Sequence, residues 1–327
     1  MALLCYHASH EQFTPSHLLR LVKLAEEAGF QGIHSSDHIA PWSVRQGQSG
    51  FTFSWIAAAL QATTLPYSMI CTPGQRLHPA MAAHAIATLG EMFPGRINFE
   101  LASGEALNEH ITGEPWPDKP IRNERLKECH TIITNLLHGQ RVTHDGLVKV
   151  SDAKIYSLPR QMPLLLCAAL SEDTSKWAGQ WADGLLTTAD ERESTEKKLE
   201  AFRGNGGAGK PCYIQYSFSY AKTEQEAIDG AFHQWRSNLV ESDALSDFTR
   251  PEQYDEAAKD VTKQDVVEKI PIITQAEQLW ENLSQFEGLG IDRISLHNVN
   301  TSHEFFIEDF GRFITAVRAG EKRYAFA

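Results

Sequence analysis

The chain has 327 residues, of which 42% are hydrophobic and 22% charged, and these proportions are typical of a globular protein with a substantial core. Its net charge of −12 at pH 7 repels nucleic acid and anionic membranes, and its longest apolar stretches are too short to cross a bilayer. We therefore expect neither a nucleic-acid partner nor a membrane partner. Residues 1–10 lack the pattern of a signal peptide, so we also expect a cytoplasmic protein.

Short runs of apolar and β-branched residues alternate with amphipathic stretches along the chain, and this alternation is typical of βαβ units around a parallel sheet. In chain order, strands are predicted over residues 3–8, 32–36, 68–72, 97–102, 164–168, 184–188, 213–219 and 293–298. Eight strands with crossover helices favour a closed (β/α)8 TIM barrel, because open doubly wound sheets more often have about five to seven strands. The predicted fold class is therefore α/β.

The first predicted helix illustrates the residue pattern from which the helices are predicted. Leu18, Leu21 and Ala25 recur at the spacing that places side chains on one helix face. Ser16 is a candidate N-cap, and Gly29 stands where a left-handed residue commonly follows a helix. Further helices are predicted over residues 54–64, 79–93, 122–137, 174–182, 191–203, 224–235, 275–286 and 304–317.

Two segments interrupt the alternation. Residues 141–156 predict a β-hairpin, with the turn at Asp145-Gly146. Residues 238–271 form a polar, acidic insertion before the last βα unit, which we expect to act as a lid or a subunit contact. Because parallel barrels reach this length as one unit, we expect residues 1–327 to form a single domain with these two insertions.

Cysteine and histidine give no sign of a disulfide or a metal. The five cysteines are far apart and lie mostly in predicted strands, which favours buried, unreactive thiols. The fourteen histidines show no HExxH motif and no paired metal-ligand spacing, so no metal site is expected.

Chemistry in such barrels sits at the C-terminal ends of the strands, where the loops converge. Polar and aromatic residues that follow the first four predicted strands include Glu11, Asp37, His38, Trp42, Thr72, Glu105 and Asn108. An Asp beside a His at a strand end can orient the imidazole as an acid or base. Glu105 follows a glycine in an expected turn, where loss of water would raise its pKa, and Trp42 offers a flat face to a planar ligand.

The same residues also fit plainer interpretations. The Asp37-His38 pair is compatible with a helix N-cap next to a solvated histidine. Glu105 is compatible with the acidic first turn of a helix, and Trp42 with loop packing. The residues alone therefore predict a barrel enzyme without specifying its reaction.

Several motifs resemble one known group. They are HASHEQF at residues 7–13, SDH at 36–38, PW at 41–42, FSW at 53–55, GEALNE at 104–109, ITG at 111–113 and WADG at 181–184. In these motifs the chain resembles the F420-dependent glucose-6-phosphate dehydrogenases of the luciferase-like superfamily. Within that group it is most similar to a branch described as non-F420, FMN-dependent oxidoreductases.

The resemblance implies a barrel with an isoalloxazine-type ring over the strand ends. It implies that His38 is the base for a substrate hydroxyl, that Glu105 donates a proton to the ring, and that Trp42 stabilises the intermediate. It also implies that the Met69-Ile70 peptide lies against the ring as a cis bond, and that Glu11 contacts substrate. The cofactor contacts implied in this way are Asp37, Met69, Ile70, Thr72, Asn108, Ala168, Ala169 and Ser171.

The chain departs from the dehydrogenases where they bind sugar phosphate. Glu191, Leu245 and Ser246 stand where Lys and Arg are expected, and only Lys269 lies near a basic position. Each lost charge-assisted hydrogen bond is worth roughly 1.5 to 3 kcal/mol, so glucose 6-phosphate is a poor substrate. Leu170-Ser171 replaces a phosphate-holding Gly-Gly, although a helix beginning near Ser171 could hold an FMN phosphate.

Together these features predict an FMN-dependent oxidoreductase or monooxygenase of the luciferase-like class, acting on an unidentified small molecule. One alternative is an F420-dependent dehydrogenase that oxidises an alcohol or sugar other than glucose 6-phosphate by hydride transfer. A second alternative is a non-catalytic flavin-binding protein. A homodimer is expected because it is usual among the proteins that the chain resembles.

Overall fold

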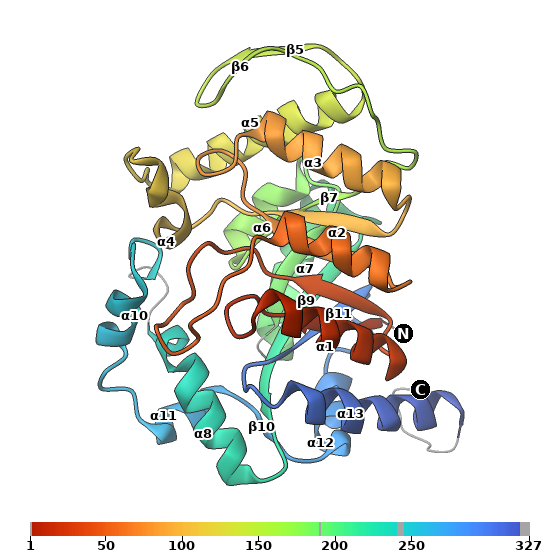
Figure 1. The fold of residues 1–327 in the computed structure, drawn as a ribbon, viewed down its shortest axis with the longest axis vertical. Helices are drawn as coiled ribbons and strands as arrows, with labels where there is room; N and C mark the ends of the chain where they lie inside the picture. Colours follow the sequence, from red (N-terminus) through yellow and green to blue (C-terminus); the bar gives the residue numbers. More distant parts are fainter. Residues whose placement is uncertain (1, 190, 241–244, 321–327) are drawn as a thin grey trace.

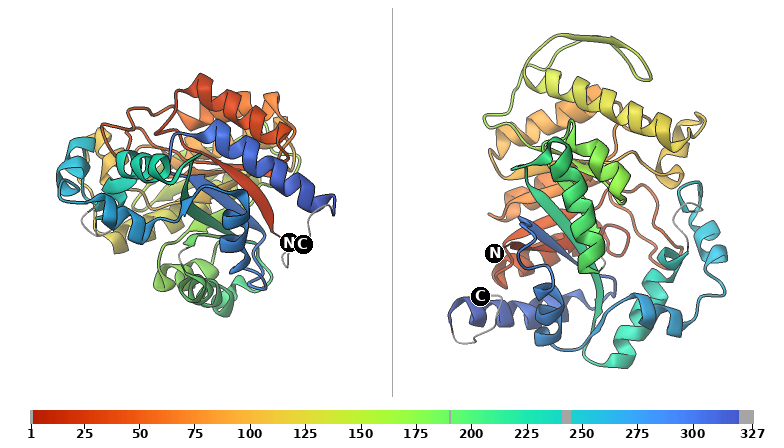
Figure 2. Two further views of the ribbon diagram at one scale, coloured as in Figure 1. Left: turned by 90° about the horizontal axis from the view of Figure 1, so that it is seen from below. Right: turned by 180° about the vertical axis from the view of Figure 1, so that it is seen from behind.

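The parallel strands of the computed structural model, which describes residues 2–189, 191–240 and 245–320, pair side by side in a closed ring (Figures 1 and 2). The ring contains β1 (Leu3–Ala8), β2 (Gly32–Ser35), β3 (Tyr67–Cys71), β4 (Ile97–Leu101), β7 (Leu165–Ala168), β8 (Leu185–Ala189), β9 (Cys212–Tyr220) and β11 (Arg293–Asn298). It closes because β9 pairs with β8 on one side and with β11 on the other, while β11 pairs with β1. The predicted barrel is confirmed.

Helices alternate with these strands and surround the ring. The longer ones are α1 (Pro15–Glu27), α2 (Thr52–Ala62), α3 (Pro79–Met92), α5 (Lys119–Leu137), α6 (Glu172–Gly179), α7 (Arg192–Phe202), α8 (Glu224–Trp235), α12 (Ala276–Ser284) and α13 (His303–Arg318). None of the helices described is long and apolar enough to span a membrane. Thr14, and not Ser16 as predicted, is the N-cap residue of α1, because Pro15 favours the first helical position; Gly29 has the expected left-handed φ of 90°.

Both insertions are present. The hairpin pairs β5 (Val142–Asp145) with β6 (Lys149–Ala153) and extends beyond α5 at the top of Figure 1. Its turn lies at residues 146–148 and not at Asp145-Gly146, because Asp145 pairs with Lys149 and remains in the strand. Between α8 and the two-residue strand β10 (Ile272–Ile273) lie α10 (Pro251–Ala257) and α11 (Lys263–Lys269); residues 241–244 of this insertion are outside those described.

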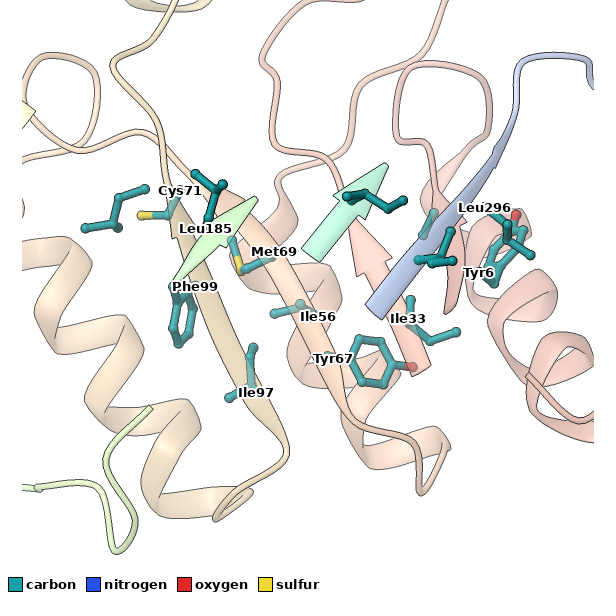
Figure 3. Packing of buried hydrophobic residues seen from close by; sticks show 14 of the residues in the cluster. Tyr6, Ile33, Ile56, Tyr67, Met69, Cys71, Ile97, Phe99, Leu185 and Leu296 are labelled. Carbon is teal, nitrogen blue, oxygen red and sulfur yellow. The ribbon is translucent and has the colours of Figure 1, made fainter. Parts of the chain in front are cut away.

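Successive strand residues face opposite sides of the barrel wall. Met69 and Phe99 point outward into the main core, where Met69 lies near Ile56 of α2 (Figure 3). A smaller apolar cluster, built on Leu166, Leu186 and Tyr213, fills part of the barrel interior. His7, His34 and Glu100 are also buried there and contact one another, so ionisable side chains lie beneath the strand ends.

Candidate active site

His38 and Glu11 form a close pair above the first two strands. His38 Nδ1 lies 2.5 Å from Glu11 Oε1, and Glu11 Oε2 accepts hydrogen bonds from the hydroxyls of Ser9 at 2.7 Å and Ser36 at 3.0 Å. Since Nδ1 is engaged, reaction of the imidazole with a ligand falls to Nε2. The sequence prediction gave the orienting role to Asp37, but the structure gives it to Glu11, which reaches His38 from the preceding loop.

The charges of the pair change both pKa values. Burial raises the pKa of Glu11, but the charge and hydrogen bond of His38 outweigh it and hold that pKa well below the usual range. Burial lowers the pKa of His38, whereas the charge and hydrogen bond of Glu11 raise it, and the net shift is upward. His38 is thus a histidine that binds a proton readily and shares it with a buried carboxylate.

Glu105 occupies the N-cap position of the short helix α4 (Ala106–Glu109) but makes no capping hydrogen bond with its side chain. Its Oε2 is enclosed and has no hydrogen-bond partner among the described residues. Burial raises the pKa of Glu105 to about 7, although the nearby charge of His38 opposes the shift. A carboxyl group in this state can carry a proton at neutral pH, in agreement with the shift expected from the sequence.

Trp42 lies between His38 and the insertion. Its ring meets the His38 ring edge to face, with centroids 5.0 Å apart, and meets Tyr254 of α10 in the same way at 5.6 Å. The Tyr254 hydroxyl donates to the Leu245 carbonyl at 2.7 Å, and Arg45 forms an ion pair with Asp255 at 2.6 Å. The insertion therefore docks on the loop after β2 and covers the site from one side.

Asp37 belongs to a second charged group, built around Arg76. Arg76 Nη2 lies 2.8 Å from Asp37 Oδ2, and Arg76 Nε lies 3.3 Å from Glu109 Oε1. Asp37 Oδ1 is buried and has no hydrogen-bond partner among the described residues, so it remains an acceptor for a ligand. Sequence reasoning missed Arg76, because it lies in the turn after β3 and meets its partners only in the folded chain.

The other predicted cofactor contacts differ in what they face. The Asn108 side chain accepts from the Ile39 amide at 2.9 Å and so joins two loops. Ile70 and Ala168 pack with the interior cluster, whereas Met69 points away from it into the main core. The described residues contain no cis peptide bond, so the cis form expected at Met69-Ile70 is wrong. Thr72 and Ala169, also predicted contacts, are buried at the ends of their strands.

Helix α6 fits a phosphate poorly. The Ser171 hydroxyl caps it by accepting from the Thr174 amide at 3.3 Å, and Glu172 and Asp173 occupy the first turn. These carboxylates already complement the positive end of the helix and repel a second anion there. The ring of a flavin or deazaflavin fits the residues better, because Asp37 and Glu105 offer unpartnered polar oxygens while Ile70 and Ala168 offer apolar surface.

The sugar-phosphate positions are not a cationic site. The Ser246 carbonyl accepts from the Ala106 amide at 3.0 Å, which places the insertion beside Glu105, yet Leu245 and Ser246 carry no charge. Lys269 is exposed at the end of α11, and Glu191 is the N-cap residue of α7. The structure thus joins Glu11, His38, Trp42 and Glu105 into one site and leaves these positions without a set of cations.

Comparison with known proteins agrees with the fold and the motifs. Residues 4–293 match the family model described as luciferase-like monooxygenase. F420-dependent glucose-6-phosphate dehydrogenase of Microbacterium testaceum is 31% identical, over 94% of this chain and 95% of that protein, and the Beutenbergia cavernae enzyme of the same name is 29% identical over 99% of both. An F420-dependent secondary alcohol dehydrogenase, solved with an F420-acetone adduct, superposes with a TM-score of 0.88 at 28% identity, covering 97% of this chain and 100% of that one. The chain therefore belongs to the luciferase-like monooxygenase family and is an oxidoreductase of the flavin- or F420-dependent kind.

Proposed function

We propose that the protein is an F420-dependent dehydrogenase that oxidises a small, uncharged alcohol by hydride transfer. The observation that carries the proposal is the His38–Glu11 pair at 2.5 Å, beside a carboxyl group whose pKa lies near 7. A hydroxyl must lose a proton as its carbon loses a hydride, and the pair supplies the base for that proton. The names of the relatives support F420 over the FMN cofactor expected from the sequence.

Each residue of the site has a separate role in such a reaction. Bound F420 would supply the hydride acceptor in its deazaflavin ring. His38 Nε2 takes the hydroxyl proton, and Glu11 stabilises the imidazolium that results. Glu105 holds a proton beside the site at neutral pH, while Trp42 and Tyr254 limit the entry of water.

Ring binding would fall to the residues with unsatisfied or apolar surface. Asp37 Oδ1 can accept a hydrogen bond from a ring N–H, and Ile70 and Ala168 provide apolar contact. Thr72, Asn108, Ala169 and Ser171 remain proposed contacts on the resemblance, and Met69 is not among them because its side chain faces outward.

Charge near the site favours an uncharged substrate. Arg76 already contacts Asp37 and Glu109, and the positions where related enzymes bind phosphate carry Glu191, Leu245 and Ser246. A phosphate placed there would lose its hydration without gaining charged partners, which costs several kcal/mol. The secondary alcohol dehydrogenase among the matched structures supports the same class of substrate.

The proposal is tested by separate titrations of purified protein with F420 and FMN, followed by a panel of secondary alcohols and glucose 6-phosphate. We expect F420 to bind more tightly and to be reduced, with loss of its visible absorption, only when a simple alcohol is added. Tighter binding of FMN, or reduction by glucose 6-phosphate alone, would contradict the proposal. The variant His38→Asn should bind F420 normally but lose turnover, and turnover equal to wild type would mean that His38 is not the base. F420 binding without turnover of any alcohol by the wild-type protein would favour a non-catalytic flavin-binding protein.

A further inference from the structure

Three ionisable side chains form a continuous row inside the barrel, which we call the buried row: Glu100 of β4, His34 of β2 and His7 of β1. His7 Nδ1 lies 2.7 Å from His34 Nδ1, and His34 Nε2 lies 2.9 Å from Glu100 Oε2. His7 is 3% exposed, and the other two are 0% exposed. His7 stands two residues before Ser9, whose hydroxyl donates to Glu11, so the row lies just beneath the candidate site.

Within the described part of the chain, Glu100 lacks the hydrogen bonds and the ion pair with arginine that would stabilise a buried carboxylate. Its contact with His34 has the distance of an ion pair but not the alignment of a hydrogen bond, and neither carboxyl oxygen has a hydrogen-bond partner among the described residues. Arg293 lies over the Tyr213 ring, at 4.8 Å from its centroid, and forms no ion pair with Glu100 among the described residues. Burying an unpaired carboxylate is costly, so one proton must reside on Glu100 or complete an imidazolium at His34.

The other ionisable groups around the buried row do not supply a positive charge that would neutralise Glu100. Burial, followed by the surrounding histidines, lowers the pKa of His7 well below its ordinary value. Burial also lowers the pKa of His297 to about 3, and those of His10 and His303 to about 4. On the other side, burial raises the pKa of Cys5 to about 12 and raises that of Tyr213. These neighbours are therefore neutral at pH 7.

The contact between His7 and His34 requires a shared proton. Two imidazole nitrogens at hydrogen-bond distance can bond only if one carries a proton and the other does not. A proton on the row can thus move between the two rings without leaving the barrel. A metal ion is not the alternative occupant, because no group of three or more His, Cys, Asp or Glu side chains in the described residues has the arrangement of a metal site.

We propose that Glu100, His34 and His7 hold one proton in common and can deliver it to an anionic group bound above His7. In delivery, His7 loses the proton on Nε2, and the Nδ1 proton of His34 moves to His7 Nδ1. His34 is then neutral, with its remaining proton on Nε2 beside ionised Glu100, and the row has lost one positive charge. If the shared proton starts on His34, only N–H bonds break within the row; if it starts on Glu100, the carboxyl O–H bond breaks and His34 Nε2 takes that proton. In both cases the proton that leaves His7 Nε2 bonds to the bound anionic group, and no electron is transferred. The presence of the shared proton does not depend on the proposed function. Delivery of the proton does rest on the proposed function.

The presence of the shared proton on the buried row is tested in ligand-free protein at pH 7. The measurements are ¹⁵N NMR of the histidine rings and ¹³C NMR of the glutamate carboxyl groups. We expect either a His34 ring protonated on both nitrogens or a protonated Glu100 carboxyl. A neutral His34 next to an ionised Glu100 in the wild-type protein would overturn the proposal, and this measurement requires no variant. In Glu100→Gln, we expect a neutral His34 ring; a doubly protonated His34 in that variant would also overturn it.

Delivery is tested with the F420-loaded protein. Glu128, which lies 3.0 Å from His144 at the surface hairpin, supplies the matched control Glu128→Gln. We expect Glu100→Gln to slow hydride transfer at least tenfold with unchanged F420 affinity, while Glu128→Gln behaves as wild type. Equal rates of hydride transfer in the two variants would overturn the delivery of the proton but not its presence. If the wild-type protein and both variants all fail to bind F420, the proposed function is contradicted and the NMR result still stands.

Discussion

At the scale of single residues, the pKa of His38 is set by opposing effects. Burial disfavours the imidazolium, and the Glu11 carboxylate more than compensates through its charge and hydrogen bond. A base must be neutral to accept a proton, so a raised pKa places the acid limb of the pH–rate profile above the ordinary value of 6.5 for histidine.

Replacing Glu11 with Gln should therefore lower the pKa of His38 and move the acid limb of kcat/KM to lower pH. The plateau rate should also fall, by about 10²-fold, because the imidazole loses its orienting partner. Steady-state rates from pH 5 to 9 measure both effects. An acid limb that stays in place would mean that Glu11 does not control His38, and Glu128→Gln serves as a control for loss of a glutamate elsewhere.

Glu105 gives a prediction that needs no cofactor. Its folded pKa of about 7 exceeds the ordinary value of 4.5, so the native protein binds this proton more tightly than the unfolded chain does. The resulting stabilisation is complete below pH 4.5 and is lost as the pH rises through 7. Glu105→Gln, which stays neutral, should melt about 1–3 °C above wild type at pH 8 and at the same temperature at pH 4. Equal melting temperatures at pH 8 would show that Glu105 titrates normally.

At the scale of elements, the strands were predictable because each is an apolar run bounded by turn residues, and all eight predicted positions carry a barrel strand. The sequence was less informative about the insertion. Helix α11 has a capping box in which Thr262 accepts from the Asp265 amide at 3.2 Å, and this Thr-x-x-Asp spacing was a usable signal. The pairing of Glu11 with His38 had no such signal, because it depends on how two loops meet in space.

The packing of α13 on α1 yields a prediction about stability. A Cβ atom at Gly311 would lie 2.6 Å from the Ala28 Cβ and 2.7 Å from the Ala28 carbonyl oxygen, so the helices can approach only because position 311 has no side chain. Gly311→Ala should destabilise the protein by about 1–3 kcal/mol, despite the roughly 1 kcal/mol gain in helix propensity. Chemical denaturation measures the change. The exposed residue Glu308 supplies the control Glu308→Ala on the same helix, and a Gly311→Ala protein as stable as that control would contradict the argument.

At the scale of the whole molecule, the outer face of α3 bears on the expected homodimer. Met81 and Met92 of this helix are 59% and 53% exposed, and Leu147 of the neighbouring hairpin is 46% exposed. Exposed apolar side chains on adjacent elements are typical of a surface that another protein covers, and we propose that a second copy of the chain covers this one.

We expect the purified protein to sediment as a dimer at micromolar concentration and Met81→Glu to shift it toward the monomer, because a dimer of two-fold symmetry would bury this charge twice. Ile121→Glu, in the first turn of α5, places the same charge at another exposed apolar residue and should leave the dimer intact. The barrel of each chain is closed without a partner, so the Met81→Glu monomer should keep its circular dichroism spectrum and its affinity for F420. A monomeric wild-type protein, or a dimer that Met81→Glu leaves unchanged, would remove α3 as the interface.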